Sequence, residues 1–123
     1  MDPRHQRRIA IVQNLYALGF EVPDNLRTAP DEGYSEALEI LKDKEEFYAK
    51  ISKHAPKFPV NSLAKVDVSI LLLAMYEITK KDHKQPVKVV INEAVELAKE
   101  LGSEKSPAFI NAILGAFIDS HEK

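Results

Sequence analysis

Apolar residues recur along most of the chain with the three- and four-residue spacing of amphipathic helices, and no stretch alternates as a strand does. The pattern predicts an all-α fold, a seven-helix, two-lobed helical bundle. The expected helices span Pro3 to Leu18, Asp31 to Lys42, Lys44 to His54, Val60 to Ala64, Asp67 to Lys80, Pro86 to Leu101, and Ser106 to the C-terminus. We expect a single domain, 1–123, with an N-terminal lobe over about residues 1–58 and a C-terminal lobe over about residues 59–123.

Capping signals support several of these boundaries. Pro86 suits the opening turn of a helix, and Gly102 suits a helix stop. Ser106 followed by Pro107 combines an N-cap residue with proline at the first helical position. Asp67 is expected to cap the fifth helix.

Two helices differ in the faces that they are expected to bury. The run from Ile70 to Tyr76 is apolar all round, which predicts a helix in the centre of the bundle. In the helix over residues 31–42, Ala37, Leu38 and Leu41 are expected to face inward.

Composition narrows the class of protein. Of the 123 residues, 45% are hydrophobic and 29% charged, which is typical of a globular domain. The absence of cysteine excludes disulfides, thiolate zinc sites and cysteine nucleophiles. No apolar run is long enough to span a membrane. The charged start is not followed by the apolar segment of a signal peptide, so we expect a cytoplasmic protein with no membrane partner.

Catalytic and metal-binding motifs are missing from the sequence. It contains no GxGxxG, P-loop, HExxH or GxSxG pattern. Its four histidines lie far apart along the chain, without the spacing of metal ligands. We therefore expect no enzymatic activity, no metal site and no cofactor.

The one basic feature is the start of the first helix, where Arg4, His5, Arg7 and Arg8 follow one another closely. At about 100° per residue, the three arginines project within about a third of the helix circumference. With a net charge of −2, any nucleic-acid site must be a local patch such as this one. Guanidinium groups suit phosphate contacts, although a solvated helix end is the simpler interpretation.

Three further positions leave alternatives open. Tyr16 and Phe109 lie in apolar helical stripes, which favours core packing, but a partly exposed ring could meet a base or a partner protein. Lys105, in the loop before the last helix, is either solvated or a phosphate contact close to the arginines.

The C-terminal half of the sequence resembles a known protein family. The segment VVINEAVELAK from Val89 to Lys99, then Gly102, then Phe109-Ile110-Asn111, resembles the signature of the NusB family. The residues Val66-Asp67, Ile70-Leu71 and Ala74 to Ile78 are similar to the preceding family helix. Arg8, Gln13, Leu15 and Tyr16 are similar to the family's first helix. The resemblance covers nearly the whole chain, and only about residues 21–59 are generic.

The resemblance implies an RNA-binding transcription antitermination factor with no enzymatic activity. Such factors bind boxA RNA together with NusE, a small-subunit ribosomal protein, and act in the RNA polymerase antitermination complex on ribosomal RNA operons. Carried over by position, the RNA contacts are Arg4, His5, Arg7, Arg8, Lys105 and Phe109. The NusE contacts are Tyr16 and Asp67, whereas Asn92, Glu93 and Asn111 are interpreted as structural.

The sequence also departs from the family pattern. Val68 and Leu72 occupy positions of the central helix where relatives usually carry basic residues. This departure motivates an alternative function, a protein-interaction module of the same fold with weak or no RNA binding. A homodimer that covers the RNA-binding face is a further alternative.

Overall fold

The computed structural model of the chain describes residues 2–19, 30–57, 62–79 and 86–121. Within these ranges it contains six α-helices and no strand. They are α1 (Pro3–Gly19), α2 (Tyr34–Leu41), α3 (Lys44–His54), α4 (Lys65–Thr79), α5 (Val87–Leu101) and α6 (Ser106–His121). The prediction of an all-α protein is confirmed, with one helix fewer than expected.

The helix predicted over residues 60–64 is not among the six helices of the described residues. Residues 60 and 61 lie outside the described ranges, and residues 62–64 include no α-helical residue. Instead α4 begins at Lys65, and the N–H of Val68 donates to the carbonyl oxygen of Ala64 at 3.0 Å. The prediction of Asp67 as an N-cap was therefore wrong, because α4 begins two residues before Asp67 and this hydrogen bond starts from the carbonyl oxygen of Ala64. Asp67 lies in the first helical turn and is nearly buried.

The second helix is shorter than predicted, and the face that it buries differs from the predicted one. Gly33 precedes it with φ 83°, and a Cβ there would lie only 2.9 Å from the backbone nitrogen of Ile11, so this position requires glycine. Ala37 and Ile40 are buried, whereas Leu38 is 41% exposed. The inward placement of Leu38 was wrong because the buried stripe runs through Ala37 and Ile40, and Leu38 projects about 100° away from Ala37.

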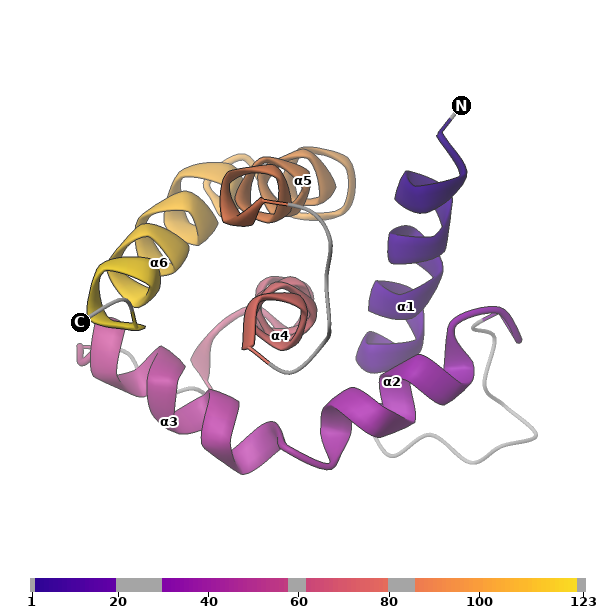
Figure 1. Cartoon of the computed structure of the whole chain (residues 1–123), viewed down its shortest axis with the longest axis horizontal. Helices are drawn as coiled ribbons and strands as arrows, with labels where there is room; N and C mark the ends of the chain where they lie inside the picture. The colour runs from indigo at the N-terminus through magenta and orange to yellow at the C-terminus, as the bar shows by residue number, and fades with distance from the viewer. Residues whose placement is uncertain (1, 20–29, 58–61, 80–85, 122–123) are drawn as a thin grey trace.

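Helix α4 occupies the centre of the molecule, as its sequence predicts. Figure 1 shows α4 end-on, with the other helices arranged around it. It contacts each of the other five helices, and Ile70, Leu71 and Met75 are completely buried. The apolar character of α4 on all sides follows from this position, because every face meets another helix.

The turn between α5 and α6 depends on two small residues. The hydroxyl oxygen of Ser106 accepts a hydrogen bond from the N–H of Ser103 at 2.9 Å. A Cβ at position 102 would lie 2.5 Å from that hydroxyl oxygen, so only glycine permits the close approach. Gly102 therefore marks the end of α5, as the sequence predicts, whereas Ser106 is the first residue of α6 and not the N-cap that the sequence predicts. Together they set the position of the loop that carries Lys105.

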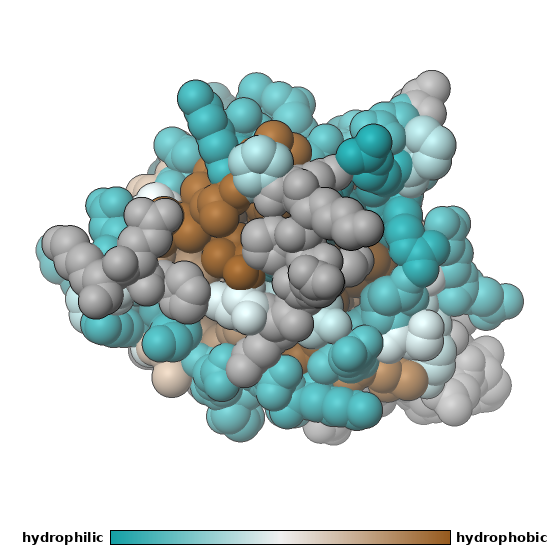
Figure 2. All heavy atoms as spheres, viewed as in Figure 1, coloured by the Kyte–Doolittle hydropathy of each residue, from teal (hydrophilic) through white to brown (hydrophobic). Residues whose placement is uncertain are grey.

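Buried apolar side chains from all six helices form one continuous cluster. It extends on both sides of the predicted lobe boundary near residue 58, which stays a prediction. Buried Asn14 places its Nδ2 atom 2.9–3.0 Å from the carbonyl oxygens of Ala10, Pro30 and Glu32, fixing the segment before α2 against α1. Figure 2 shows hydrophilic side chains around the edge of one face and apolar surface where α5 and α6 approach α4. Across the described residues, no helix combines the length and apolar character that a membrane span requires.

Candidate nucleic-acid interface

The basic residues at the start of α1 lie in its first two turns, but the structure gives them different surroundings. Arg4 is exposed, and its backbone N–H donates to the Oδ1 atom of Asp2 at 2.9 Å. This contact satisfies one of the free N–H groups at the helix start and leaves the side chain in solvent. Among the described residues, no carboxylate pairs with the Arg4 guanidinium.

His5 lies between two carboxylates of α5. Its Nδ1 atom is 2.9 Å from Oε2 of Glu93, and its Nε2 atom is 3.1 Å from Oε1 of Glu100. A neutral imidazole has a single N–H, so it can donate to only one of these carboxylates, whereas the imidazolium can donate to both. The hydrogen bonds to Glu93 and Glu100 raise the pKa of His5 above its usual value. His5 therefore attaches the start of α1 to α5, and its side chain is only 14% exposed.

Arg8 forms the most buried ion pair that the described residues contain. Its Nε and Nη2 atoms donate to the two carboxylate oxygens of Glu77 on α4, both at 2.9 Å. The side chains of Arg8 and Glu77 are 11% and 9% exposed, respectively. This bidentate geometry is the one that best matches a guanidinium to a carboxylate, and it links α1 to the central helix. The predicted RNA contact of Arg8 thus competes with a carboxylate that already occupies the guanidinium.

Arg7 is more accessible than Arg8. Its guanidinium pairs with the carboxylate of Glu36 on α2 and lies 3.8 Å from Oε1 of Glu32. The Arg7 side chain is 52% exposed, so solvent screens these pairs and they hold the guanidinium only weakly. A phosphate could replace either carboxylate without uncovering the core.

The other two predicted RNA contacts lie at the α5–α6 corner. Lys105 is exposed immediately before α6 and forms no ion pair with a described residue. Phe109 is partly buried and packs against the apolar core. Phe109 is therefore part of the core, as its apolar stripe predicts, and is also exposed enough to contact a base or a partner protein.

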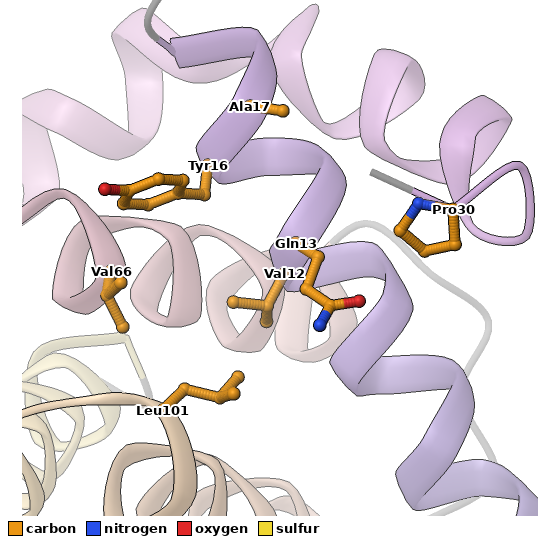
Figure 3. Close-up of a pocket in the computed structure, with 7 residues that line it drawn as sticks. All are labelled: Val12, Gln13, Tyr16, Ala17, Pro30, Val66 and Leu101. Atoms are coloured by element: carbon orange, nitrogen blue, oxygen red, sulfur yellow. The ribbon is translucent and has the colours of Figure 1, made fainter. Parts of the chain in front are cut away.

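Tyr16 lies on a second surface, between two hollows. It is 40% exposed and lines both of them. Figure 3 shows the first hollow, where Tyr16 and Val12 of α1 lie near Val66 of α4 and Leu101 of α5. The second extends along the other side of Tyr16 to Leu41, Tyr48 and Leu72. An exposed aromatic ring between two largely apolar hollows is typical of a protein-binding surface.

Asp67, the second predicted partner contact, follows directly after Val66 in the first turn of α4. It is 8% exposed, and its Oδ1 atom has no hydrogen-bond partner among the described residues. A buried carboxylate oxygen without a donor is costly, so a donor supplied by a binding partner would stabilise it.

The signature residues also separate into two groups. Glu93 bridges α5 to α1 through His5, in agreement with a structural function. Asn92 and Asn111 are exposed, and neither hydrogen-bonds a described residue, so no contact of the described residues supports the structural function interpreted for them. Val68 and Leu72 are buried in the core, which accounts for their apolar side chains.

The acidic partners of the basic patch were not among the predicted site residues. Glu77, Glu93 and Glu100 are distant from α1 in sequence and become its neighbours only when the helices pack. The i, i+7 spacing of Glu93 and Glu100 places both on one face of α5, which was the available signal. No group of three or more histidine, aspartate or glutamate residues in the described part of the chain is arranged to hold a metal ion.

Comparison with known proteins gives a consistent result. A model of the NusB family matches residues 5–119. The transcription antitermination protein NusB of Herpetosiphon aurantiacus is 35% identical over 97% of this chain and 92% of its own. Among solved structures, T. maritima NusB has a TM-score of 0.78 at 28% identity, covering 100% of this chain and 95% of that one. A structure of the antitermination factors NusB and NusE in complex with dsRNA has a TM-score of 0.67 at 18% identity, covering 97% and 99% of the two chains, which shows the shared fold.

Proposed function

The chain belongs to the NusB family, and we propose that it is a transcription antitermination factor that binds boxA-type single-stranded RNA together with NusE. Its place would be in the RNA polymerase antitermination complex, where it supports processive transcription of ribosomal RNA operons. The family assignment supports this proposal, as does a protein of the same fold that forms a complex with NusE and RNA.

One observation on this chain supports the RNA-binding part: exposed cations occur in two separate segments that contacts between α1 and α5 connect. Arg4 and Arg7 project from the start of α1, and Lys105 projects from the loop after α5. The contacts of His5 with Glu93 and Glu100 hold that start of α1 alongside the second half of α5. Phosphates of a single strand could therefore contact both groups, with the part-exposed ring of Phe109 available to a base.

We assign a different function to the two part-buried residues of the patch, His5 and Arg8. His5 and Arg8 neutralise carboxylates on α5 and α4 and orient the first turns of α1. Their contribution to RNA binding is then mostly indirect, because they present Arg4 and Arg7 in a fixed direction. The NusE contact is proposed for the surface around Tyr16, with Asp67 accepting a hydrogen bond from the partner.

The alternative function is a protein-interaction module that binds RNA weakly or not at all. It is favoured by the acidic partners of the basic patch, since carboxylates already pair with His5, Arg7 and Arg8. NusE binding that RNA does not strengthen would support this alternative. Homodimer formation through the same surface is distinguished by light scattering over a concentration series.

The test is fluorescence anisotropy with a boxA RNA and a scrambled control, with and without NusE, at two salt concentrations. We expect binding that selects boxA, weakens with salt and is strengthened by NusE. The double variant Arg4→Ala/Arg7→Ala should reduce affinity by roughly tenfold or more, on the basis of two lost phosphate contacts.

A matched control removes two exposed lysines from α3, which packs on the other side of α4 (Figure 1). The variant Lys44→Ala/Lys50→Ala changes the net charge equally and should leave RNA affinity nearly unchanged. Equal losses in the two double variants would show that only total charge matters and would refute the assignment of the patch. No boxA selectivity under any condition would refute the proposed function.

A further inference from the structure

An open polar cleft of about 500 Å³ lies between the outer faces of α5 and α6, and the proposed function does not use it. Its lining includes Asn92, Glu96 and Lys99 from α5 and Pro107, Ala108 and Asn111 from α6. Asn92 and Asn111 are both exposed, and neither makes a hydrogen bond with any described residue. Two carboxamides from different helices therefore face one cleft with their hydrogen-bonding groups available.

The cleft adjoins the proposed RNA contacts on both of its helices. On α5, Asn92 precedes Glu93, the residue that holds His5. On α6, Pro107 lies two positions after Lys105. A single strand whose phosphates contact Arg4 and Lys105 would therefore pass along the rim of this cleft.

The chemistry of the lining suits a base better than a phosphate. A carboxamide presents a donor and an acceptor side by side, which matches the paired groups on the edge of a nucleobase. The single acid, Glu96, lies 3.2 Å from the ammonium of Lys99, so the two charges largely offset each other. Pro107 and Ala108 contribute short side chains to the lining, which leaves room for a flat ring.

We propose that this cleft is a nucleobase subsite for single-stranded RNA, in which Asn92 and Asn111 hydrogen-bond the edge of an unpaired base. The inference rests on the proposed RNA binding and adds the residues that would distinguish one base from another. Phosphate contacts position a strand without reading its sequence, so selectivity must come from groups such as these.

The experiment compares wild-type protein with the double variant Asn92→Ala/Asn111→Ala by fluorescence anisotropy. The probes are the boxA RNA, a set of single-base replacements, and the same RNA with an abasic ribose at each position in turn. For the wild type, we expect one or two positions where base removal weakens binding by roughly tenfold or more. In the double variant, the penalty at those positions should disappear, while binding of the abasic RNA and its salt dependence stay unchanged.

The control is Ser52→Ala, which removes an exposed polar side chain from α3, on the other side of α4 (Figure 1). It should keep the wild-type penalty at every position. Unchanged base selectivity in the Asn92→Ala/Asn111→Ala variant would overturn the inference. An equal loss for all probes, abasic ones included, would also overturn it, because the cleft would then contact only the backbone.

Two other outcomes separate this inference from the proposed function. If wild-type protein binds no RNA, the proposed function fails, and the subsite with it. If the double variant keeps RNA selectivity but loses NusE binding, the cleft is a protein contact and the subsite alone is overturned.

Discussion

Removing the Arg8 guanidinium should destabilise the fold, because it leaves a nearly buried carboxylate without its partner. Glu77 is 9% exposed and accepts two hydrogen bonds of 2.9 Å from Arg8. Breaking a buried pair from one side typically costs about 3–5 kcal/mol. For a chain of this length, each kcal/mol lowers the melting temperature by about 3–4 °C. The variant Arg8→Met should therefore melt roughly 10–20 °C lower than the wild type.

Thermal and urea denaturation followed by circular dichroism would measure this change. The double variant Arg8→Met/Glu77→Leu removes both charges and should recover most of the lost stability, since apolar replacement of a whole buried pair is often neutral. A loss below about 1 kcal/mol for Arg8→Met would refute the reasoning, because an exposed pair costs that little. A double variant as unstable as the sum of its two single variants would refute it equally.

The same pair of variants tests the separation of structural and RNA-binding cations. Below its melting temperature, Arg8→Met/Glu77→Leu should bind boxA RNA within about threefold of the wild type, because the protein loses no exposed phosphate contact. A loss as large as that of Arg4→Ala/Arg7→Ala would show that Arg8 contacts RNA directly. Arg8 would then have to leave Glu77 when RNA binds.

Three further predictions follow from individual contacts. Glu36→Gln removes a competitor of phosphate at Arg7 and should raise RNA affinity by up to about fivefold in anisotropy measurements, whereas Glu45→Gln on α3 should not. His5 should titrate above its ordinary pKa of about 6.5 in NMR spectra. The stability that it contributes is present below that value and is lost as the pH rises through the raised pKa. A pKa at or below 6.5 in the wild type, or a pKa of His5 that does not decrease in Glu93→Gln, would contradict this prediction. Gly33→Ala should cost at least about 1–2 kcal/mol in urea denaturation because of its positive φ, while Gly115→Ala in α6, which meets nothing within 4 Å, should be neutral or stabilising by up to about 1 kcal/mol.

Much of the fold could be predicted because it depends on local signals. The start signals at Pro86 and Ser106 and the stop at Gly102 act within a few residues, and each lies within one residue of a helix end in the structure. The central position of α4 follows from an apolar surface on every side, which only complete enclosure by other helices satisfies. The buried face of α2 was not predictable in the same way. Neighbouring residues of a helix point in different directions, so Ala37 is buried while Leu38, the next residue, is exposed.

The division of the basic patch could not be predicted, because it depends on distant partners. Arg8 meets Glu77 across 69 residues, and His5 meets Glu93 across 88. In the sequence, the four cations are equivalent members of one helix start. Packing of α1 against α4 and α5 then pairs His5 and Arg8 with carboxylates of those helices and leaves Arg4 and Arg7 near solvent.

This division predicts how strongly salt should weaken RNA binding. For single strands, the logarithm of affinity falls with the logarithm of salt concentration, with a slope of about −0.7 for each phosphate contact. If Arg4, Arg7 and Lys105 make the phosphate contacts, the slope should be about −2, whereas participation of His5 and Arg8 as well would bring it to about −3.5. Titrations of boxA RNA at several salt concentrations separate these values. The control variant Lys44→Ala/Lys50→Ala should give the same slope as the wild type. A slope near −3.5 in the wild type would mean that RNA displaces Glu77, Glu93 and Glu100 from their partners, and the start of α1 would then have to move on binding.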